Sequence, residues 1–432
     1  MTALSLAFLS VLFFFGRPAG VWGQTLTTVC GEQASSCGGS QEIRFRGFQW
    51  KLVRDVIHGG MLWLGGTSAN AGIYSNALWR YSIVDRSWTK LLDNGATQSA
   101  HCAQSGPPYD VAEPLNGHPL GYTFLHGVTW HVTAQLCRGF NAGYTNRWNL
   151  ETRSLMDRLN VGLFGCSSTF DCSAANQWGS IVYVSQQNAS YYCCSGRGGV
   201  RRYEEFDGSR YVDITSRVKG EDELPCDRSA HCPPARLNGA SVMSDGANLW
   251  VYGGCEGSLP GNGTGANRCN GKPHNDLYRL DLTSWKWKKL DPAGSKPNPL
   301  TSSFAFIAFD SRRGRFLIYE DTDSWRQYSV AANTWSELEV SGHGPRMDAS
   351  RLDNSNGNMA EYDPATDTMV LLTGRSQIYA PEVYELSLED ESPGVASRKA
   401  GGRAARSTTD DGLLIQTGKR RLAQVRLHTP KP

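Results

Sequence analysis

Short apolar runs separated by turn residues dominate the chain beyond residue 40. Seven of these runs read as short strands, and most follow a Gly or Asp that favours a tight turn. Their starts are spaced by roughly 40 to 70 residues, the size of a four-stranded unit with variable loops. The seven runs are residues 61–66, 128–135, 180–185, 248–254, 315–320, 368–374 and 412–418.

A repeated phrase organises these runs. In two places the strand ends on a glycine pair, Gly65-Gly66 and Gly253-Gly254. A Trp then follows an Asn or Asp after 12 residues, and a Leu stands three residues beyond each Trp. Three copies keep this spacing: Asn76 with Trp88, Asn275 with Trp287, and Asp323 with Trp335. A large aromatic side chain at a fixed place in each unit is suited to fill the layer between neighbouring sheets.

This combination of an apolar strand, Gly-Gly, Asn/Asp-x-Leu-aromatic and Trp resembles the kelch repeat. The resemblance covers the chain from about residue 41 to the C-terminus, and it implies an all-β propeller of the galactose-oxidase-like/kelch superfamily. We expect seven blades, with six as the alternative. Where the repeat is degenerate, Leu155 or Met156 replaces the Trp of the second unit and Tyr211 that of the third. The sixth unit has no aromatic residue at this place.

The last unit is short of strands. Residues 412–418 and 420–427 predict only two, whereas residues 42–48 form a surplus strand before the first full unit. We expect this N-terminal strand to complete the last blade and close the ring, because closure removes the free edges of an open ring. The alternative is an extra outer strand on the first unit.

The first residues have the pattern of a secretory signal. The apolar run at residues 4–15 is too short to span a bilayer and is followed by Arg17 and Pro18. Small residues before Gln24 predict cleavage there, although no basic residue precedes the apolar run. We therefore expect a signal peptide at 1–23, a cysteine-containing lead-in at 24–40, one propeller domain at 41–430, and a secreted protein without a membrane span.

The 12 cysteines all follow this signal, as expected for disulfides in an exported protein. A phrase shared by residues 99–102 and 229–232 suggests equivalent bridges, Cys102–Cys137 and Cys232–Cys255. The next candidate pairs are Cys30–Cys37, Cys166–Cys172 and Cys226–Cys269, with separate partners for the adjacent Cys193 and Cys194. No C-x-x-C pair occurs, which argues against a structural zinc site, and we expect no metal. We also expect no cofactor. The sequons at Asn188 and Asn262 are compatible with N-glycosylation.

Composition narrows the partners. The net charge is +2 and charged residues make up 19% of the chain, which argues against nucleic acid or an anionic membrane surface as a partner. The 47 Gly and 13 Trp residues fit a protein of many short strands and turns. The oligomeric state cannot be read from these numbers.

Four arginines stand near the starts of predicted innermost strands: Arg54, Arg236, Arg346 and Arg403. The favoured interpretation is that each pairs with a carboxylate or carbonyl of a neighbouring blade. The alternative is that the four side chains converge on an anion, such as a carboxylate, at the channel mouth. No catalytic residues are assigned. The favoured function is a binding module that recognises an extracellular protein or glycan through rim loops, including residues 98–119 and 255–275. The alternative, implied by the resemblance, is a sugar mutarotase-like or epimerase-like enzyme at the channel mouth, which would need a cluster of carboxylate, His and Arg.

Overall fold

The computed structural model describes residues 24–30, 52–64, 78–92, 120–123, 127–132, 144–159, 180–194, 203–234, 237–238, 240–256, 272–298, 306–320, 324–345, 360–373 and 382–388. These residues lie in one compact unit, Met1–Asp390. Apart from one short 3₁₀ helix, Thr215–Arg217, their regular structure is strand. No helix among them is long and apolar enough to cross a membrane.

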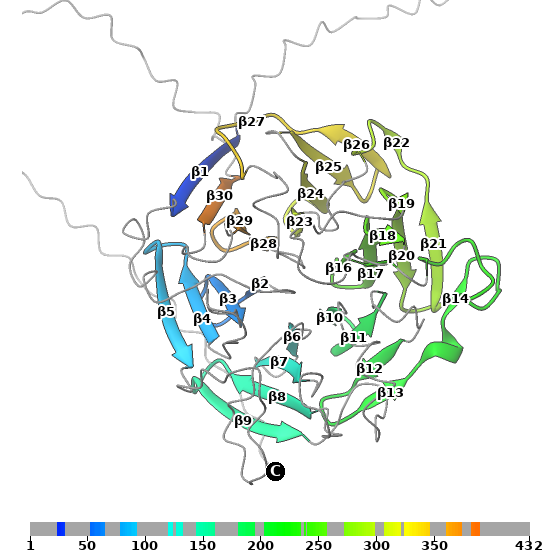
Figure 1. Ribbon diagram of the computed structural model, residues 1–432, viewed down its shortest axis with the longest axis horizontal. Coiled ribbons are helices and arrows are strands. Elements are labelled where there is room, and N and C mark those ends of the chain that lie inside the picture. The colour runs from blue at the N-terminus through cyan, green and yellow to red at the C-terminus, as the bar shows by residue number, and fades with distance from the viewer. Residues whose placement is uncertain are drawn as a thin grey trace, which may run out of the picture. The chain divides into compact units, whose positions relative to one another are not determined.

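Six sheets in the described part share one antiparallel plan of four strands side by side (Figure 1). The first three sheets contain β2 (Leu52–Arg54), β3 (Met61–Leu64), β4 (Leu78–Ser82) and β5 (Ser87–Leu92); β6 (Leu120–Thr123), β7 (Gly127–Val132), β8 (Tyr144–Asn149) and β9 (Ser154–Leu159); and β10 (Ser180–Val184), β11 (Ala189–Cys193), β12 (Glu204–Phe206) and β13 (Tyr211–Asp213).

The other three sheets each gain a two-residue parallel strand on the outer edge, supplied by the connection from the sheet before. They contain β16 (Ser241–Ser244), β17 (Asn248–Tyr252), β20 (Leu277–Asp281), β21 (Lys286–Leu290) and β14 (Lys219–Gly220); β23 (Phe306–Asp310), β24 (Arg315–Tyr319), β25 (Trp325–Ser329), β26 (Thr334–Glu337) and β22 (Ala293–Gly294); and β28 (Ala360–Asp363), β29 (Thr368–Thr373), β30 (Glu382–Ser387), β1 (Gln24–Cys30) and β27 (Val340–Ser341).

The first strands of these sheets surround a common centre. They contact one another in a closed cycle, in the order β2, β6, β10, β16, β23, β28 and back to β2. In Figure 1 the remaining strands of each sheet extend outward from this cycle. The described unit is therefore a β-propeller.

The expectation of seven blades is wrong for the described residues. Their seventh sheet has only three two-residue strands, β15 (Leu237–Asn238), β18 (Cys255–Glu256) and β19 (Lys272–Pro273). These strands continue β16, β17 and β20 along the chain, so they extend an existing sheet and add no unit. Residues 412–418 and 420–427, the predicted seventh unit, lie outside the described residues.

An N-terminal strand joins the last sheet, but it is β1, from the predicted lead-in at 24–40. β1 pairs antiparallel with β30, with Leu26 opposite Leu386. The predicted closing strand, residues 42–48, lies outside the described residues. Because the fourth strand of the last sheet comes from the other end of the chain, the cycle closes on β28–β30 without a further unit.

The repeat tryptophans lie in fourth strands and fill the layer between sheets. Trp88, Trp287 and Trp335 are all buried. Trp335 in β26 packs on Tyr252 of the preceding sheet with ring centroids 5.8 Å apart, and Trp287 packs on Tyr203 at 6.3 Å. In the last sheet Leu26 of β1 holds the same place and is only 4% exposed. This explains why the sixth unit shows no aromatic residue after its third strand.

Two glycines mark the equivalence of Trp335 and Leu26. A Cβ on Gly294 would lie 2.0 Å from the carbonyl oxygen of Trp335, and a Cβ on Gly342 would lie 2.3 Å from that of Leu26. Both glycines have positive φ, which a side chain disfavours. The parallel edge strands can therefore lie directly over the fourth strands only because glycine stands there.

Short polar residues start most of the described hairpins. In hairpins between third and fourth strands, Ser82, Asn149, Asp281 and Ser329 each accept hydrogen bonds from amides two or three residues later. Asp55, Asp245, Asp310 and Asp363 do the same between first and second strands. Side-chain acceptors of this kind fix the turn and hence the register of the strands.

Replacing Leu26 tests whether β1 fills the position of a repeat Trp. Leu26→Ala should lower the free energy of unfolding by about 2–3 kcal/mol, because it leaves a cavity in a closed core. Val84→Ala is the control, because Val84 is 83% exposed and should change stability by less than about 0.5 kcal/mol. Urea unfolding of both variants measures the difference. Equal stabilities would show that β1 does not hold the last sheet.

Candidate functional site

A central cavity of about 330 Å³ is the candidate site. It is lined by the first strands of five sheets, β2, β10, β16, β23 and β28, and by the turns that follow them. Its apolar lining includes Leu52, Val182, Val242, Ile307 and Ala360. Its polar lining includes Arg54, Ser185, Ser244, Asp245, Ser311 and Glu361. An apolar wall with a few polar groups is the usual make-up of a ligand pocket.

The polar lining lies toward one end of the propeller. In an antiparallel sheet the first-to-second and third-to-fourth hairpins lie at the same end. We call this end the hairpin face, defined by the first-to-second hairpins 55–60, 185–188, 245–248, 311–314 and 364–367. Val56, Ser185, Asp245 and Ser311 belong to these hairpins and line the cavity. The polar end of the cavity is therefore on the hairpin face.

Arg54 is the one arginine of the predicted four that the structure describes. It lies at the end of β2, lines the cavity and is partly exposed. Within the described residues its guanidinium has no ion pair and no hydrogen bond. The pairing of Arg54 with a neighbouring blade, which the sequence favoured, therefore stays a prediction. Arg236, Arg346 and Arg403 lie outside the described residues, so their convergence with Arg54 stays a prediction.

The aspartates at the polar end of the cavity already accept hydrogen bonds within their own hairpins. Asp245 accepts from the amides of Ala247 and Asn248 with Oδ1, and from Asn248 Nδ2 and the Trp250 indole N–H with Oδ2. Asp55 is buried, accepts two amides with Oδ1, and has Oδ2 3.2 Å from His58 Nδ1. Both carboxylates therefore hold turns in place.

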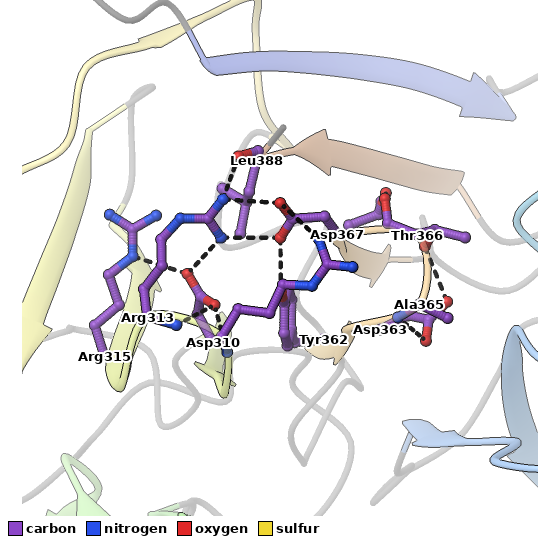
Figure 2. A network of polar contacts seen from close by, with 11 residues as sticks. Asp310, Arg313, Arg315, Tyr362, Asp363, Ala365, Thr366, Asp367 and Leu388 are labelled. Carbon is purple, nitrogen blue, oxygen red and sulfur yellow. Dashed lines mark hydrogen bonds and ion pairs between the residues drawn. The ribbon is translucent and has the colours of Figure 1, made fainter. Parts of the chain in front are cut away.

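An ion-pair network fixes two walls of the cavity relative to each other (Figure 2). Arg313, in the β23–β24 hairpin, donates two hydrogen bonds to the carboxylate of Asp367 in the β28–β29 hairpin, at 2.9 and 2.8 Å. It also donates to Asp310 at 3.1 Å and to the Leu388 carbonyl at 2.7 Å. Arg315 Nε completes the network by donating to Asp310 Oδ2, the same oxygen that Arg313 contacts, at 2.9 Å. The bidentate geometry holds β23 and β28 in one arrangement.

Tyr362 connects the network to the cavity. It lies in the lining, and its hydroxyl donates to Asp367 at 2.6 Å. Burial and the neighbouring carboxylates raise the pKa of Tyr362 far above its usual range. The hydrogen bonds from Arg313 lower the pKa of Asp367 to about 2. Tyr362 therefore presents a neutral ring whose hydroxyl is engaged.

A second contact joins the β10 and β16 walls. The carbonyl of Gly246 accepts from the Gln186 amide at 2.9 Å and from the Ser185 hydroxyl at 3.3 Å. On the first sheet, the Tyr81 hydroxyl donates to Glu385 of β30 at 2.7 Å. Links between neighbouring sheets thus occur at three places around the propeller, two in the hairpins that follow first strands and one between the third strands β4 and β30. This favours a cavity whose shape is set before a ligand arrives.

The repeat residues Asn275 and Asp276 have structural roles at the opposite face. Asn275 donates to the carbonyl of Pro297 at 2.6 Å. Asp276 lies 2.9 Å from Lys289 Nζ and 3.0 Å from Lys296 Nζ, and contacts His274. His274 and these lysines hold the pKa of Asp276 well below its usual range. The repeat motif therefore stabilises the turn between second and third strands.

Two predicted disulfide pairings are wrong. Cys226 bonds to Cys232, with Cα atoms 5.3 Å apart, which contradicts the predicted pairs Cys226–Cys269 and Cys232–Cys255. Between the two cysteines the chain turns back on itself: the amides of Arg228 and Ser229 donate to the carbonyl of Pro225, and the His231 amide donates to the Ser229 hydroxyl. This turn brings Cys232 close to Cys226. Cys193 and Cys194, expected to have separate partners, bond to each other. The side chains of the remaining candidates lie outside the described residues: Cys30, Cys37, Cys102, Cys137, Cys166, Cys172, Cys255 and Cys269.

Several other predicted features can be placed. Asn188 is exposed in the β10–β11 hairpin, on the hairpin face, and its Oδ1 accepts a hydrogen bond from the Tyr183 hydroxyl at 3.1 Å. Gly253 and Gly254 follow β17, and both have positive φ. Gly65, Gly66 and Asn262 lie outside the described residues, as do the linker 98–119 and most of the insert 255–275.

The chain matches no known protein-family model. It also shows no significant similarity to any curated protein. Kelch membership therefore remains a resemblance carried by the motif, whereas the propeller arrangement rests on the structure.

Removing Arg313 tests the network between β23 and β28. Arg313→Ala should cost about 3 kcal/mol of unfolding free energy, since it leaves Asp367, only 5% exposed at its side chain, without its main partner. Arg210→Ala is the control, because its ion pair with Asp207 is on the surface and should contribute less than about 1 kcal/mol. Similar losses in both variants would contradict a structural role for Arg313.

The stability of the protein should also depend on pH through Asp367. The pKa of Asp367 in the folded protein, about 2, is below its usual value of about 3.9. The ionised Asp367 therefore contributes fully to the free energy of unfolding above about pH 4, and this stabilisation is lost as the pH falls through 2. Denaturation at pH 2 to 6 should show that the Arg313→Ala deficit shrinks toward low pH. A deficit that is constant over this range would exclude the carboxylate as the partner.

Proposed function

We propose that this chain is an exported β-propeller that binds an extracellular glycan, and that a carboxylate-bearing sugar of this glycan enters the central cavity. The observation that carries the proposal is the Arg54 guanidinium, which lines the cavity without a partner among the described residues. An arginine fork binds a carboxylate through two parallel hydrogen bonds.

The rest of the lining suits a sugar. The polar lining includes three hydroxyl groups, from Ser185, Ser244 and Ser311, and the carboxylate of Glu361. The volume of about 330 Å³ is at the lower end of ligand pockets and is of the order of one sugar ring with its substituents. Tyr183 of β10, Phe309 of β23 and Tyr362 of β28 add aromatic rings to the lining, which can pack on the apolar faces of a sugar.

Binding fits the geometry better than isomerisation of a sugar. An enzyme of that class would need a carboxylate, a histidine and an arginine directed at the substrate. Among the described residues no histidine lines the cavity, and both oxygens of Asp245 are used within its own hairpin. The rim loops at 98–119 and 255–275 remain candidates for contacts with a partner protein.

Export is supported by the predicted signal and by the two disulfides among the described residues. Strand β1 begins at Gln24, the residue at which cleavage is predicted. We expect mass spectrometry of the protein secreted by a eukaryotic host to find Gln24 as the first residue. A secreted form that retains residues 1–23 would contradict the cleavage, and retention in the cytoplasm would contradict export.

A glycan screen with Arg54 variants tests the function. Purified full-length protein should bind acidic glycans in preference to neutral ones on a glycan array. Arg54→Ala should weaken binding of a hit by about 10- to 100-fold, the value of charge-assisted hydrogen bonds, and Arg54→Lys should lose less. Titration calorimetry measures both affinities.

Arg228→Ala is the matched control, because it removes the same charge from a side chain that is 72% exposed and far from the lining residues along the chain. Equal losses for Arg54→Ala and Arg228→Ala would indicate a general charge effect. Binding only to acidic peptides, or to no glycan at all, would overturn the proposal.

A further inference from the structure

Two adjacent cysteines stand where another sheet has its glycine pair. β10 and β11 are joined by a four-residue hairpin, with Val184 opposite Ala189, and β16 and β17 by a hairpin of the same length, with Ser244 opposite Leu249. Counted from these pairs, Cys193 falls at the position of Gly253 and Cys194 at that of Gly254. The cysteines therefore end the second strand of their sheet as the glycines do in theirs.

The backbone agrees with this equivalence at the second position of each pair and differs at the first, because Gly253 has a φ of 69° whereas Cys193 does not have a positive φ. Gly254 has a φ of 93°, and Cys194 has a φ of 74°. A positive φ is easily adopted by glycine but is disfavoured for a residue with a Cβ. In the β16–β17 sheet the absence of a side chain permits this conformation. In the β10–β11 sheet Cys194 is constrained by its bond to Cys193, which closes a small ring through the intervening peptide.

We propose that Cys193–Cys194 is a reducible modification site for small thiols, and that the bond maintains the strand end that glycine maintains elsewhere. Cys193 is fully buried, whereas Cys194 is partly exposed and packs against the same apolar cluster. An external thiolate would therefore attack the sulfur of Cys194. The disulfide bond breaks, Cys193 leaves as a thiolate and takes up a proton, and a mixed disulfide forms on Cys194. A second thiol releases Cys194 as a thiol and leaves as the oxidised disulfide of the reductant.

Reduction then affects the cavity wall. Once the ring is open, Cys194 is an ordinary residue at a disfavoured φ, so the end of β11 loses its constraint. β11 pairs with β10 along its whole length, with Cys193 opposite Ser180. β10 lines the central cavity through Ile181, Val182 and Tyr183. Opening the bond should therefore increase the mobility of residues 180–194. This inference concerns redox chemistry and does not depend on the ligand of the cavity.

Thiol trapping on the folded full-length protein tests the reaction. The protein is treated with dithiothreitol at neutral pH without denaturant and then alkylated with N-ethylmaleimide, and peptides are analysed by mass spectrometry. We expect labels on Cys193 and Cys194 before Cys226 and Cys232, which are both buried. No labelling of Cys193 and Cys194, or labelling only together with Cys226 and Cys232, would overturn the proposal.

Two double variants test the replacement of glycine. The first carries Cys193→Gly with Cys194→Gly, and the second carries Cys193→Ala with Cys194→Ala. Hydrogen exchange of residues 180–194 should be slow in the glycine variant, whether or not dithiothreitol is present. It should be at least several-fold faster in the alanine variant, and in the wild type only after reduction. Equal exchange in both variants, or no change in the wild type on reduction, would contradict the structural role. The wild-type comparison remains decisive if a variant does not fold.

Discussion

The pairing of β1 with β30 is the contact on which the rest of the structure depends. It joins residues at opposite ends of the described chain, with Leu26 opposite Leu386, and it completes the last sheet. The first strand of that sheet, β28, contacts both β23 and β2. The central cavity needs this cycle of first strands, because its lining comes from five different sheets. Closure by a strand from the distant terminus thus creates a single cavity from separate, local hairpin units.

The repeat could be predicted from sequence because it is local. The 12-residue spacing that ends at Trp88, Trp287 and Trp335 correctly indicated four-stranded units packed through aromatic residues. Five of the seven predicted runs are the second strands β3, β7, β17, β24 and β29. The run at 180–185 is instead a first strand, β10. The second strand of this sheet, β11, ends on Cys193-Cys194 and lacks the glycine pair by which the sequence could have identified it.

The remaining features depend on contacts between distant residues. Leu26 does not resemble a repeat Trp, and only the pairing with β30 shows that it occupies the same place. The contact of Arg313 with Asp367 joins residues 54 positions apart, without a local motif to announce it. The Cys226–Cys232 bond could have been suspected from the six-residue separation and the turn residues between them. The polar residues that open the hairpins, such as Asp245 and Asp281, were a further local signal that could have located the turns.

The two ends of the propeller differ in construction. At the hairpin face, short turns are held by side-chain acceptors, and neighbouring hairpins are linked by Arg313 and by the Gly246 carbonyl. At the opposite face lie the strand ends that carry the Gly253-Gly254 pair and the Cys193–Cys194 bond. We propose that an acidic sugar binds at the polar end of the central cavity, on the hairpin face. Hydrogen exchange with and without a bound acidic glycan tests it directly. We expect slower exchange on ligand binding in the segments that line the cavity: residues 52–56, 181–185, 242–246, 307–311 and 360–362. Protection confined to segments at the opposite face, with these five segments unchanged, would contradict it.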